Sequence, residues 1–366
     1  METRTQLHGV REQRGISAAQ LAKLAGVSRQ TVYAVEAGDY VPNTTLALQL
    51  ARILDVRVED LFHLDTDARA LPAPVTVDLL STGGPARRGQ PVQVCRVGKR
   101  TVGVSADPQP IMLPLADGVI VEGSKVHLFQ DLDASKRLLV AGCDPGISLL
   151  AQHLGRFEGV DLLVALSSSR QALEWLRQGR VHVAGSHLRD ASSGEYNLPA
   201  VRRMFPQGAV KVVTFAIWEQ GLVFASGNPK SIRGVEDFAR KEVRIVNREK
   251  GAGSRELLDE KLRTAGVAAS RVKGYDQIAH GHLPAALAVS LGDADCCIAT
   301  RSAARAFGLG FLPLATERYD LVIRRQFTQL PAVEALLDVL NRAAIRRKLE
   351  ILAGYDMRHT GEVVGG

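Results

Sequence analysis

The first 64 residues carry apolar side chains at the three- and four-residue spacing of short amphipathic helices. This spacing predicts a first helix over residues 4–14, with Leu7 and Val10 facing inward. Ser17 stands where the N-cap of a second helix belongs, and Gln20 completes a capping-box pattern with it. The apolar stripe expected on this second helix consists of Leu21, Ala22, Leu24 and Ala25.

A short turn separates the second predicted helix from a third. Gly26 lies in this turn, where glycine accepts backbone conformations that other residues resist. Ser28 is expected to cap the third helix, whose inward residues are Val32 and Val35. The outer face of the third helix is left to Arg29, Gln30 and Tyr33. Two short helices joined in this way are typical of a helix-turn-helix.

Two further helices are predicted before the pattern changes. Thr44 or Thr45 is expected to cap a fourth helix that runs to Leu54. A short helix within residues 56–62 follows it. Together these patterns predict an all-α domain over residues 1–64.

A polar, proline-punctuated linker at residues 65–74 leads into a different pattern. Apolar and polar positions alternate within residues 75–132, in the segments VTVDLL, PVQVCRVG, RTVGVS, PIMLPL and GVIVEGSKVHLF. This alternation predicts a small β module of about five strands. We interpret the module as a spacer or a dimerisation element.

Strand and helix patterns alternate from residue 137 onward, as in LLVAGC before DPGISLLAQHL and VDLLVAL before SSSRQALEWLRQG. The alternation predicts an α/β domain over residues 137–366 with mainly parallel strands. Roughly 230 residues suit two lobes better than one. The chain is therefore expected to be multidomain.

Composition changes this picture only slightly. The chain is 46% hydrophobic and 23% charged, which is ordinary for globular proteins. No apolar run is long enough to span a membrane, and the first residues lack the apolar core of a signal peptide, so a cytoplasmic protein is expected. The net charge of +7 is compatible with nucleic acid, but acidic and basic residues cancel within the first 64.

The reactive residue types show no arrangement that predicts catalysis or metal binding. The four cysteines form no CxxC pair: Cys95, Cys143, Cys296 and Cys297. Cys296 and Cys297 are expected to be buried, inert thiols. Histidines are scattered without metal-binding spacing, and His187 and His282 are those expected to line a cleft. Without a GxSxG or similar motif, no catalytic residue is assigned and no enzyme is predicted.

Residues 7–62 resemble the lambda-repressor-like (XRE) DNA-binding domain, through LHGVREQRGIS, AQLAKLAGVSRQTVYAVEAGDYVPN and TLALQLARILDVRVEDLF. The resemblance implies a recognition helix over residues 28–36. It places the DNA contacts on four residues: Ser28, Arg29, Gln30 and Tyr33. Arginine and glutamine suit guanine and adenine edges. Ala18 stands where the family often has glutamine, so the usual polar contact is not expected there.

A second resemblance covers residues from 138 to the end, through GCDPGISLLAQHL, AGSHLRDASSGEYNLPAVRRMFP, EQGLVFASGNPKSIRGVEDFAR, VRIVNREKGAGSRELLDEKL and ERYDLVI. These segments resemble the PBP-like domain related to molybdate-binding periplasmic proteins and to LysR-type effector domains. The resemblance implies an α/β, two-lobed type 2 periplasmic-binding-protein fold with a ligand cleft between the lobes. Residues 251–255 read GAGSR where the family usually has GSGTR, and residues 295–298 read DCCI in place of a glycine-rich strand end.

Three turns in this region join a strand to a helix: residues 144–148, 167–170 and 247–255. Ligands in open α/β sheets bind beyond such strand ends, where helix N-termini favour anions. The serines could donate to an anion or could only cap helices. Arg255 could pair with a carboxylate or phosphate, which favours a larger anion such as a pterin phosphate, or with an acidic neighbour. The predicted ligand-binding residues are Asp144, Ser148, Ser167, Ser168, Ser169, His187, Asn247, Gly251, Gly253, Ser254, Arg255 and Tyr275.

These predictions together describe a one-component transcription regulator that binds double-stranded DNA as a homodimer. The PBP-like resemblance implies molybdate, tungstate or a molybdopterin-related anion as effector, with no resident cofactor and no membrane partner. A small organic acid, as in LysR-type domains, is the alternative effector. Two alternatives from other classes remain: an accessory protein of molybdopterin metabolism and a protein-interaction module.

Overall fold

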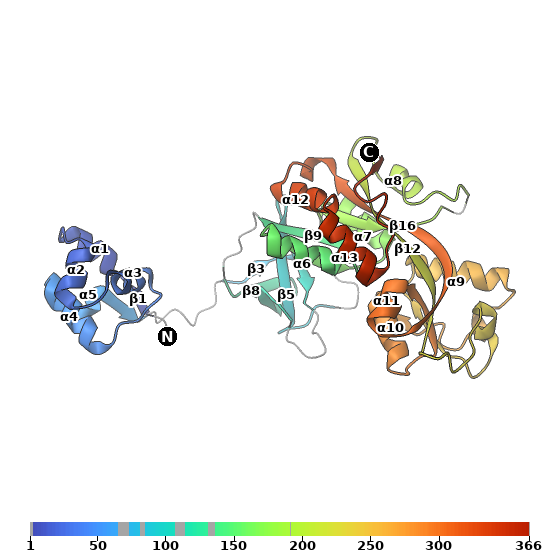
Figure 1. The fold of residues 1–366 in the computed structure, drawn as a ribbon, viewed down its shortest axis with the longest axis horizontal. Coiled ribbons are helices and arrows are strands. Elements are labelled where there is room, and N and C mark those ends of the chain that lie inside the picture. Colours follow the sequence, from blue (N-terminus) through green and yellow to red (C-terminus); the bar gives the residue numbers. More distant parts are fainter. Residues whose placement is uncertain are drawn as a thin grey trace. The chain divides into compact units, whose positions relative to one another are not determined.

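The computed structural model describes residues 3–64, 73–80, 85–106, 114–130, 136–190 and 192–365. The chain divides into two compact units, residues 1–73 and 74–366 (Figure 1). Within these described ranges, no helix combines the length and the apolar character that crossing a membrane requires.

The first unit is a small helical domain closed by a two-stranded ribbon. Its elements are β1 (Thr3–Thr5), α1 (Leu7–Gln13), α2 (Ala18–Ala25), α3 (Arg29–Ala37), α4 (Thr44–Leu54), α5 (Val58–Leu61) and β2 (Phe62–Leu64). Strands β1 and β2 pair antiparallel, with Thr5 opposite Phe62. The helices bury one shared apolar core, which includes Leu7, Leu21, Val32, Leu50, Leu54 and Leu61. The predicted all-α domain is thus confirmed, with the ribbon added.

The helix-turn-helix has the local structure that its sequence predicts. The Ser17 hydroxyl accepts a hydrogen bond from the Gln20 amide at 3.2 Å, and the Ser17 amide donates to Gln20 Oε1 at 2.9 Å, which completes the capping box. Gly26 adopts the left-handed conformation, with φ of 66°. Ser28 caps α3 by accepting from the Thr31 amide at 3.0 Å.

Several local predictions in this unit were wrong. Helix α1 begins at Leu7, because residues 3–5 pair in β1 instead. Leu24 is 64% exposed, since the inner face of α2 is formed by other residues of that helix. The cap of α4 is Asn43, whose side chain accepts from the Leu46 amide at 2.9 Å, and not a threonine. The last helix is also shorter than expected, because Phe62 already belongs to β2.

A buried ion pair ties the predicted recognition helix α3 to α1. Arg11 Nε donates to Glu36 Oε1 at 2.6 Å and Arg11 Nη2 donates to Glu36 Oε2 at 3.2 Å. Arg11 Nη1 also donates to the Ile16 carbonyl at 2.9 Å. This bidentate geometry fixes the orientation of α3 relative to the rest of the domain.

The β module is a six-stranded sheet with strand order β3-β8-β7-β5-β6-β4. Its strands are β3 (Val75–Thr76), β4 (Asp78–Leu80), β5 (Pro91–Val97), β6 (Arg100–Ser105), β7 (Gly118–Glu122) and β8 (Lys125–Leu128). The expected strand PIMLPL falls largely on residues 110–113, which lie outside the described residues, and Pro114 and Leu115 are not in a strand.

One face of the β module joins the core of the α/β body. Cys95, Val97 and Val102 pack into the same apolar cluster as strands of that body. At its border Arg137 donates to Asp117 at 2.6 and 2.9 Å and to the Val94 carbonyl at 2.7 Å. These contacts attach the module to the α/β body.

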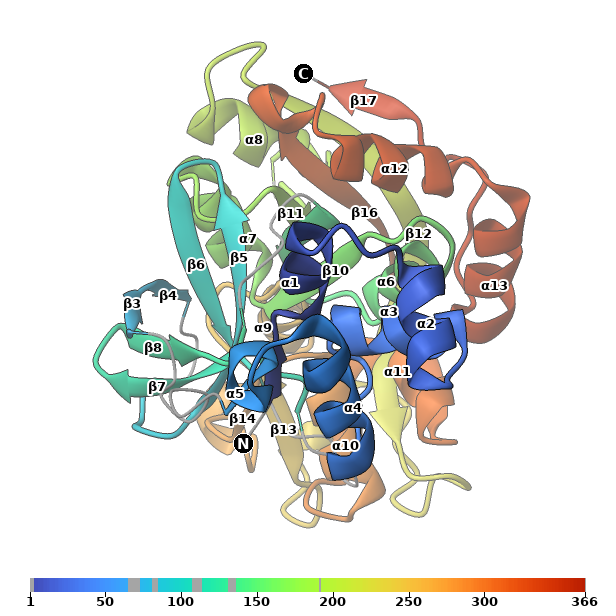
Figure 2. The same ribbon diagram turned by 90° about the vertical axis from the view of Figure 1, so that its left-hand side faces the viewer.

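The α/β body is built on a nine-stranded sheet with order β10-β9-β11-β16-β12-β15-β13-β14, and β17 pairs with β12. The strands are β9 (Arg137–Gly142), β10 (Asp161–Leu166), β11 (Val183–Ser186), β12 (Val210–Phe224), β13 (Ile245–Arg248), β14 (Ile278–Ala279), β15 (Cys296–Thr300), β16 (Gly310–Arg324) and β17 (Val363–Gly365). The expected mainly parallel sheet was wrong at its centre. Strands β12 and β16 pair antiparallel along their whole length (Figure 2), whereas β9, β10 and β11 are parallel.

Two lobes form at opposite ends of this central strand pair, because β12 and β16 are long enough to enter both. The first lobe carries α6 (Ile147–Phe157), α7 (Ser169–Arg177), α8 (Leu198–Met204), α12 (Pro331–Leu340) and α13 (Ala343–Ala353). The second lobe carries α9 (Gly253–Thr264), α10 (His282–Ser290) and α11 (Arg301–Ala306), with separate apolar clusters on the two faces of its sheet. Irregular pairing between Gln220 and Gly221 marks the crossing from lobe to lobe. The two-lobed architecture predicted from the sequence is confirmed.

Candidate functional site

A pocket of about 220 Å³ lies between the two lobes and is lined by both of them. The first lobe contributes Cys143, Leu166, Ser167, Ser168 and Gln171. The second lobe contributes Arg248, Glu249, Lys250, His280 and Gly281. A ligand in this pocket would therefore touch both lobes at once.

The first-lobe wall consists of strand ends and one helix start. Cys143 follows β9, and Ser167 follows β10, with the Ser167 amide donating to the Gly142 carbonyl at 3.2 Å. Ser168 caps α7 by accepting from the Gln171 amide at 3.3 Å. The Ser167 hydroxyl is buried and has no hydrogen-bond partner among the described residues. Helix α7 thus presents its positive end and a free hydroxyl to the pocket.

The second-lobe wall is dominated by Arg248, the last residue of β13, which is only 2% exposed. Its Nε and Nη2 donate to the Glu249 carboxylate at 2.9 and 3.0 Å. Its third nitrogen, Nη1, has no hydrogen-bond partner in the part of the chain that the structure describes. Burial lowers the pKa of Arg248, but Glu249 and the nearby Cys143 raise it by more. The net pKa is raised, so the guanidinium stays charged. A buried, incompletely paired cation is costly unless a ligand completes its bonds.

Next to this pocket, two imidazoles converge on the Cys143 thiol. Cys143 Sγ lies 3.4 Å from His187 Nε2 and 3.7 Å from His282 Nε2. All three side chains are buried, and their ligand atoms lie within 4.8 Å of one another. Cys143 and His187 follow strands β9 and β11 of the first lobe, whereas His282 begins α10 of the second. The cluster therefore joins the two lobes.

The orientation of His187 is fixed from its other side. Its Nδ1 lies 2.7 Å from Glu317 Oε2, and Gln220 donates to the same carboxylate oxygen. A Cβ on Gly253 would lie 2.5 Å from His187 Cε1, so only glycine lets α9 begin against this ring. Burial lowers the pKa of His187, whereas Cys143 and Glu317 raise it, and the net pKa is raised. Burial, Arg248 and His187 all lower the pKa of His282, which is therefore a neutral imidazole.

Known protein families match both parts of the chain. A model described as the PBP superfamily domain matches residues 151–341, about half of the chain, and a helix-turn-helix model matches residues 7–61. The chain belongs to the PBP superfamily. Because a helix-turn-helix precedes the superfamily domain, this member is a DNA-binding regulator with a PBP-like ligand-binding domain.

Relatives of this PBP superfamily member match one part or the other. The uncharacterized protein YvgK of Bacillus subtilis is 35% identical over 232 residues, covering 63% of this chain and 75% of YvgK. An uncharacterized HTH-type transcriptional regulator of Archaeoglobus fulgidus is 39% identical over 64 residues, covering 18% of this chain and 91% of the regulator. The structure of the sulfate-binding protein SubI of Mycobacterium tuberculosis aligns with a TM-score of 0.46 at 18% identity, covering 60% of this chain and 86% of SubI.

Among the residues predicted to bind ligand in this PBP superfamily member, Ser167 and Ser168 line the small pocket. Gly251 lies at the same boundary between the lobes, where a Cβ would lie 3.5 Å from Ser168 Oγ. Its φ of +85° favours glycine in any case. Ser254 is buried, and its hydroxyl has no hydrogen-bond partner within the described ranges.

Other predicted ligand residues are engaged within the protein. The Ser169 hydroxyl accepts from the His187 backbone amide, and the Asn247 side-chain amide donates to the Tyr275 carbonyl. The Ser148 hydroxyl is exposed and donates to the Pro145 carbonyl. These bonds hold turns and strands in position.

Asp144 is buried beside the cluster and accepts from the Gly146 amide at 2.6 Å and from the Tyr355 hydroxyl at 2.8 Å. Burial raises the pKa of Asp144 to about 7, although these hydrogen bonds oppose the shift. Asp144 and Ser148 line a second cavity and not the small pocket.

Arg255, expected to pair with a ligand anion or with an acidic neighbour, contacts other residues of the second lobe. Its Nη1 donates to the Arg248 carbonyl at 3.1 Å, and its guanidinium lies 4.8 Å from the centre of the Tyr275 ring. The Tyr275 hydroxyl donates to Asp259 at 2.6 Å. Arg255 and Tyr275 line neither the small pocket nor the second cavity.

Sequence reasoning missed Arg248, Lys250 and Cys143 as pocket residues. The rule that ligands bind at strand ends could have found Arg248 and Cys143, since each stands at the end of a strand. The prediction rested on the serines and glycines of the turns, which are neighbours of Arg248 and Cys143 in the sequence. Glu317 lies within the long strand β16, and nothing local distinguishes it.

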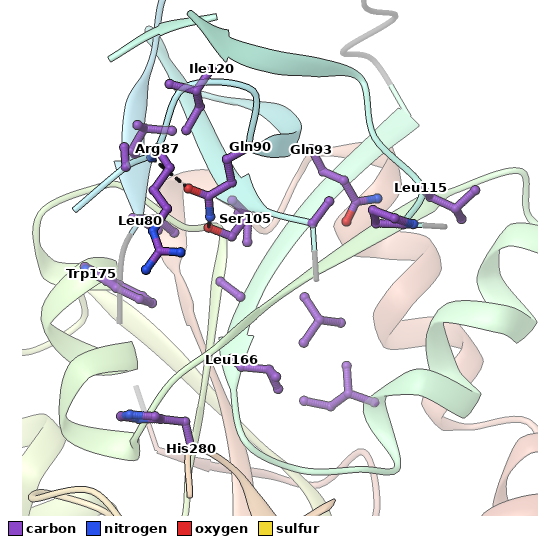
Figure 3. A pocket seen from close by; sticks show the side chains of 18 of the residues that line it. Leu80, Arg87, Gln90, Gln93, Ser105, Leu115, Ile120, Leu166, Trp175 and His280 are labelled. Carbon is purple, nitrogen blue, oxygen red and sulfur yellow. Dashed lines mark hydrogen bonds between the residues drawn. The ribbon is translucent and has the colours of Figure 1, made fainter. Parts of the chain in front are cut away.

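A larger cavity of about 990 Å³ adjoins the small pocket and shares Leu166 and His280 with it. Its opposite wall is the β module. Figure 3 shows Ile120 and Gln90 at the end of the cavity far from His280. The β module therefore encloses space next to the pocket between the lobes.

On the helix-turn-helix, the four residues predicted to contact DNA lie together on an exposed face of α3 and its cap: Ser28, Arg29, Gln30 and Tyr33. Arg29 donates to the Tyr33 hydroxyl at 3.0 and 3.2 Å. The Arg29 guanidinium also lies 5.5 Å from the centre of the Tyr33 ring. This contact holds the arginine on the outer face of the helix.

Proposed function

We propose that this protein is a one-component transcription regulator whose effector is a small anion bound by Arg248 between the two lobes. The observation that carries the proposal is the buried guanidinium at the wall of a 220 Å³ pocket, with one nitrogen that has no hydrogen-bond partner among the described residues. Lys250, the Ser167 hydroxyl and the positive end of α7 line the same pocket. These donors and charges share one preference, which is for a negatively charged ligand.

The volume of the pocket restricts the effector. Pockets for drug-sized molecules measure about 300–1,000 Å³, so a pocket of about 220 Å³ suits a smaller ligand. A tetrahedral oxyanion fits both the size and the cluster of donors. Molybdate and tungstate are the first choices, because they are what the PBP-like resemblance implies.

The location of the pocket suggests how binding is transmitted. A ligand that contacts both lobes stabilises the arrangement in which they meet, and shifts the population toward it. In a homodimer this shift would alter how the two helix-turn-helix domains engage their half-sites, which lie about one helical turn or a multiple of it apart. Since double-stranded DNA is the partner, we place the protein in the cytoplasm.

The test combines calorimetry with a DNA-binding assay on the full chain. Molybdate, tungstate, sulfate and phosphate are titrated in turn, and an operator selected from random DNA is then bound with and without the best ligand. Arg248→Gln should weaken the anion by about 1.5–3 kcal/mol, the range for a hydrogen bond to a charged group. The matched control is Arg271→Gln, which removes the same charge at an exposed position. Equal affinities in the two variants would refute the proposal.

The larger cavity favours one alternative effector. Because it shares Leu166 and His280 with the small pocket, an organic anion could place its charged group beside Arg248 and its body in the cavity. Titrating short-chain and aromatic carboxylates and phosphate monoesters separates the alternatives. Tight binding of such a compound, with oxyanions binding only weakly, would select the organic effector.

A further inference from the structure

We propose that Cys143, His187 and His282 form a binding site for a single transition-metal ion of the Zn²⁺ class. The site would lie at the boundary of the lobes, beside the anion pocket. The inference does not depend on the identity of the effector, and it departs from the sequence-based expectation of no metal site.

The sulfur–nitrogen distances in the cluster match those of a tetrahedral zinc site. A tetrahedral zinc ion with Zn–S of about 2.3 Å and Zn–N of about 2.0–2.1 Å separates its sulfur and nitrogen ligands by about 3.6 Å. Cys143 Sγ lies 3.4 Å from one Nε2 and 3.7 Å from the other. Both sulfur–nitrogen separations therefore already match those of such an ion.

The ligand types and the residues around them also suit a transition-metal ion. One thiolate and two imidazoles suit zinc, cobalt, nickel and copper, and not magnesium or calcium. His187 is orientated through Nδ1 by Glu317, the arrangement that typically supports a metal-bound histidine. Glu317 and Glu249 also bring negative charge close to the cluster, which offsets that of a buried dication and of Arg248.

The position of His282 distinguishes a metal site from the competing interpretation. A thiol, an imidazole and a carboxylate in series also describe an activated cysteine nucleophile. That arrangement requires Cys143, His187 and Glu317 only. The second imidazole reaches the same sulfur from the other lobe, and a shared metal ion explains why both Nε2 atoms converge on it.

Three protein ligands leave a fourth position for an exchangeable ligand, as in open zinc sites. Of the three ligands, Cys143 also lines the small pocket, so the cluster borders it. A metal ion held by residues of both lobes would also favour their closed arrangement. The protein would then respond to the metal through the same movement that we propose for the anion.

The test uses the reduced full-length protein, stripped of metal with a chelator and titrated anaerobically with Co²⁺. We expect one equivalent to bind, with a sulfur-to-cobalt charge-transfer band and the intense visible bands of tetrahedral Co²⁺, all removed by one equivalent of Zn²⁺. Cys143→Ala should abolish the charge-transfer band, whereas Cys297→Ala, which removes another buried thiol, should keep it. His282→Gln should weaken Co²⁺ at least tenfold with the thiolate band retained at saturation. Circular dichroism checks that each variant is folded.

Failure of the metal site and failure of the anion site give different results. Arg248→Gln should weaken anion binding and keep the charge-transfer band. If the unmodified protein shows no such band at stoichiometric Co²⁺, or if Cys143→Ala retains it, the metal site is wrong. Rapid alkylation of Cys143 in a protein that binds neither ion would favour the nucleophile instead. If Cys143→Ala does not fold, the His282→Gln titration decides, and an unchanged Co²⁺ affinity there overturns the proposal.

Discussion

Replacing Glu36 by glutamine should destabilise the DNA-binding unit selectively. The Arg11 and Glu36 side chains are 9% and 7% exposed, and two hydrogen bonds join them. Glu36→Gln removes the negative charge. It leaves the Arg11 guanidinium with a single neutral amide oxygen, which is a weaker acceptor than the carboxylate. Exposed pairs contribute about 0.2–1 kcal/mol, and breaking a deeply buried pair costs about 3–5 kcal/mol. This pair lies in a small unit with little protein around it, so we expect a loss of about 2 kcal/mol.

Such a loss is large for this unit. At about 0.05–0.15 kcal/mol per residue, a domain of about 60 residues has a total stability of about 3–9 kcal/mol. Losing about 2 kcal/mol raises the unfolded population about 30-fold. Hydrogen exchange followed by mass spectrometry on peptides from α2 to α4 should therefore accelerate by about that factor. Peptides from the α/β body should be unaffected, because they belong to the other unit.

Two controls isolate the ion pair from the loss of a charge. Glu12→Gln removes an acidic group that is 61% exposed on the same helix as Arg11, and should change exchange little. The double variant Arg11→Met with Glu36→Leu replaces both partners by apolar groups, and should recover much of the lost stability. The reasoning is refuted if Glu36→Gln exchanges like Glu12→Gln, or if the double variant is as unstable as the single one.

Three further predictions follow from charges elsewhere in the structure. Burial raises the pKa of Glu36, but hydrogen bonds from its basic neighbours lower it more, so the net pKa is below the usual 4.5. The stability that this group contributes should be present above that pH and lost as the pH falls further. Acid titration followed by circular dichroism will show this loss, and a flat profile would contradict it. Arg29→Ala and Gln30→Ala should each relax base preference by about 1–3 kcal/mol in a binding assay across operator variants, whereas a uniform loss of affinity would indicate phosphate contacts. Arg170→Gln breaks an exposed ion pair with Glu256 between the lobes, at 2.9 Å, and should weaken effector binding by no more than about 1 kcal/mol in calorimetry. A loss of effector affinity as large as that of Arg248→Gln would show that this pair controls closure of the lobes.

The helix-turn-helix could be predicted from the sequence because its signals are local. The Ser17 capping box, the left-handed Gly26 and the Ser28 cap each involve residues within four positions of one another. Where such signals competed, the prediction failed: Asn43 and not a threonine caps α4, since its side chain reaches the Leu46 amide. The start of α1 could not be placed, because pairing of β1 with a strand some 60 residues later decides it.

The ligand-binding body was predictable in outline and not at its centre. Alternating strands and helices indicate an α/β fold, and the strand-end turns contain Ser167 and Ser168, which line the small pocket. The antiparallel pairing of β12 with β16 depends on contacts about 100 residues apart along the chain, which no local pattern encodes.

The cluster of Cys143, His187 and His282 is the feature that only the tertiary structure decided. The residues that meet at the sulfur lie 44 and 139 positions from it in sequence, so no spacing motif contains them. Arg248 and Arg255 are both basic residues of one turn region, yet the fold aims one at the pocket and seats the other against Tyr275. The sequence determines which strands and helices form, because propensity and capping act over a few residues. Which side chains share a cavity is determined by how the lobes pack, because that depends on contacts between distant segments.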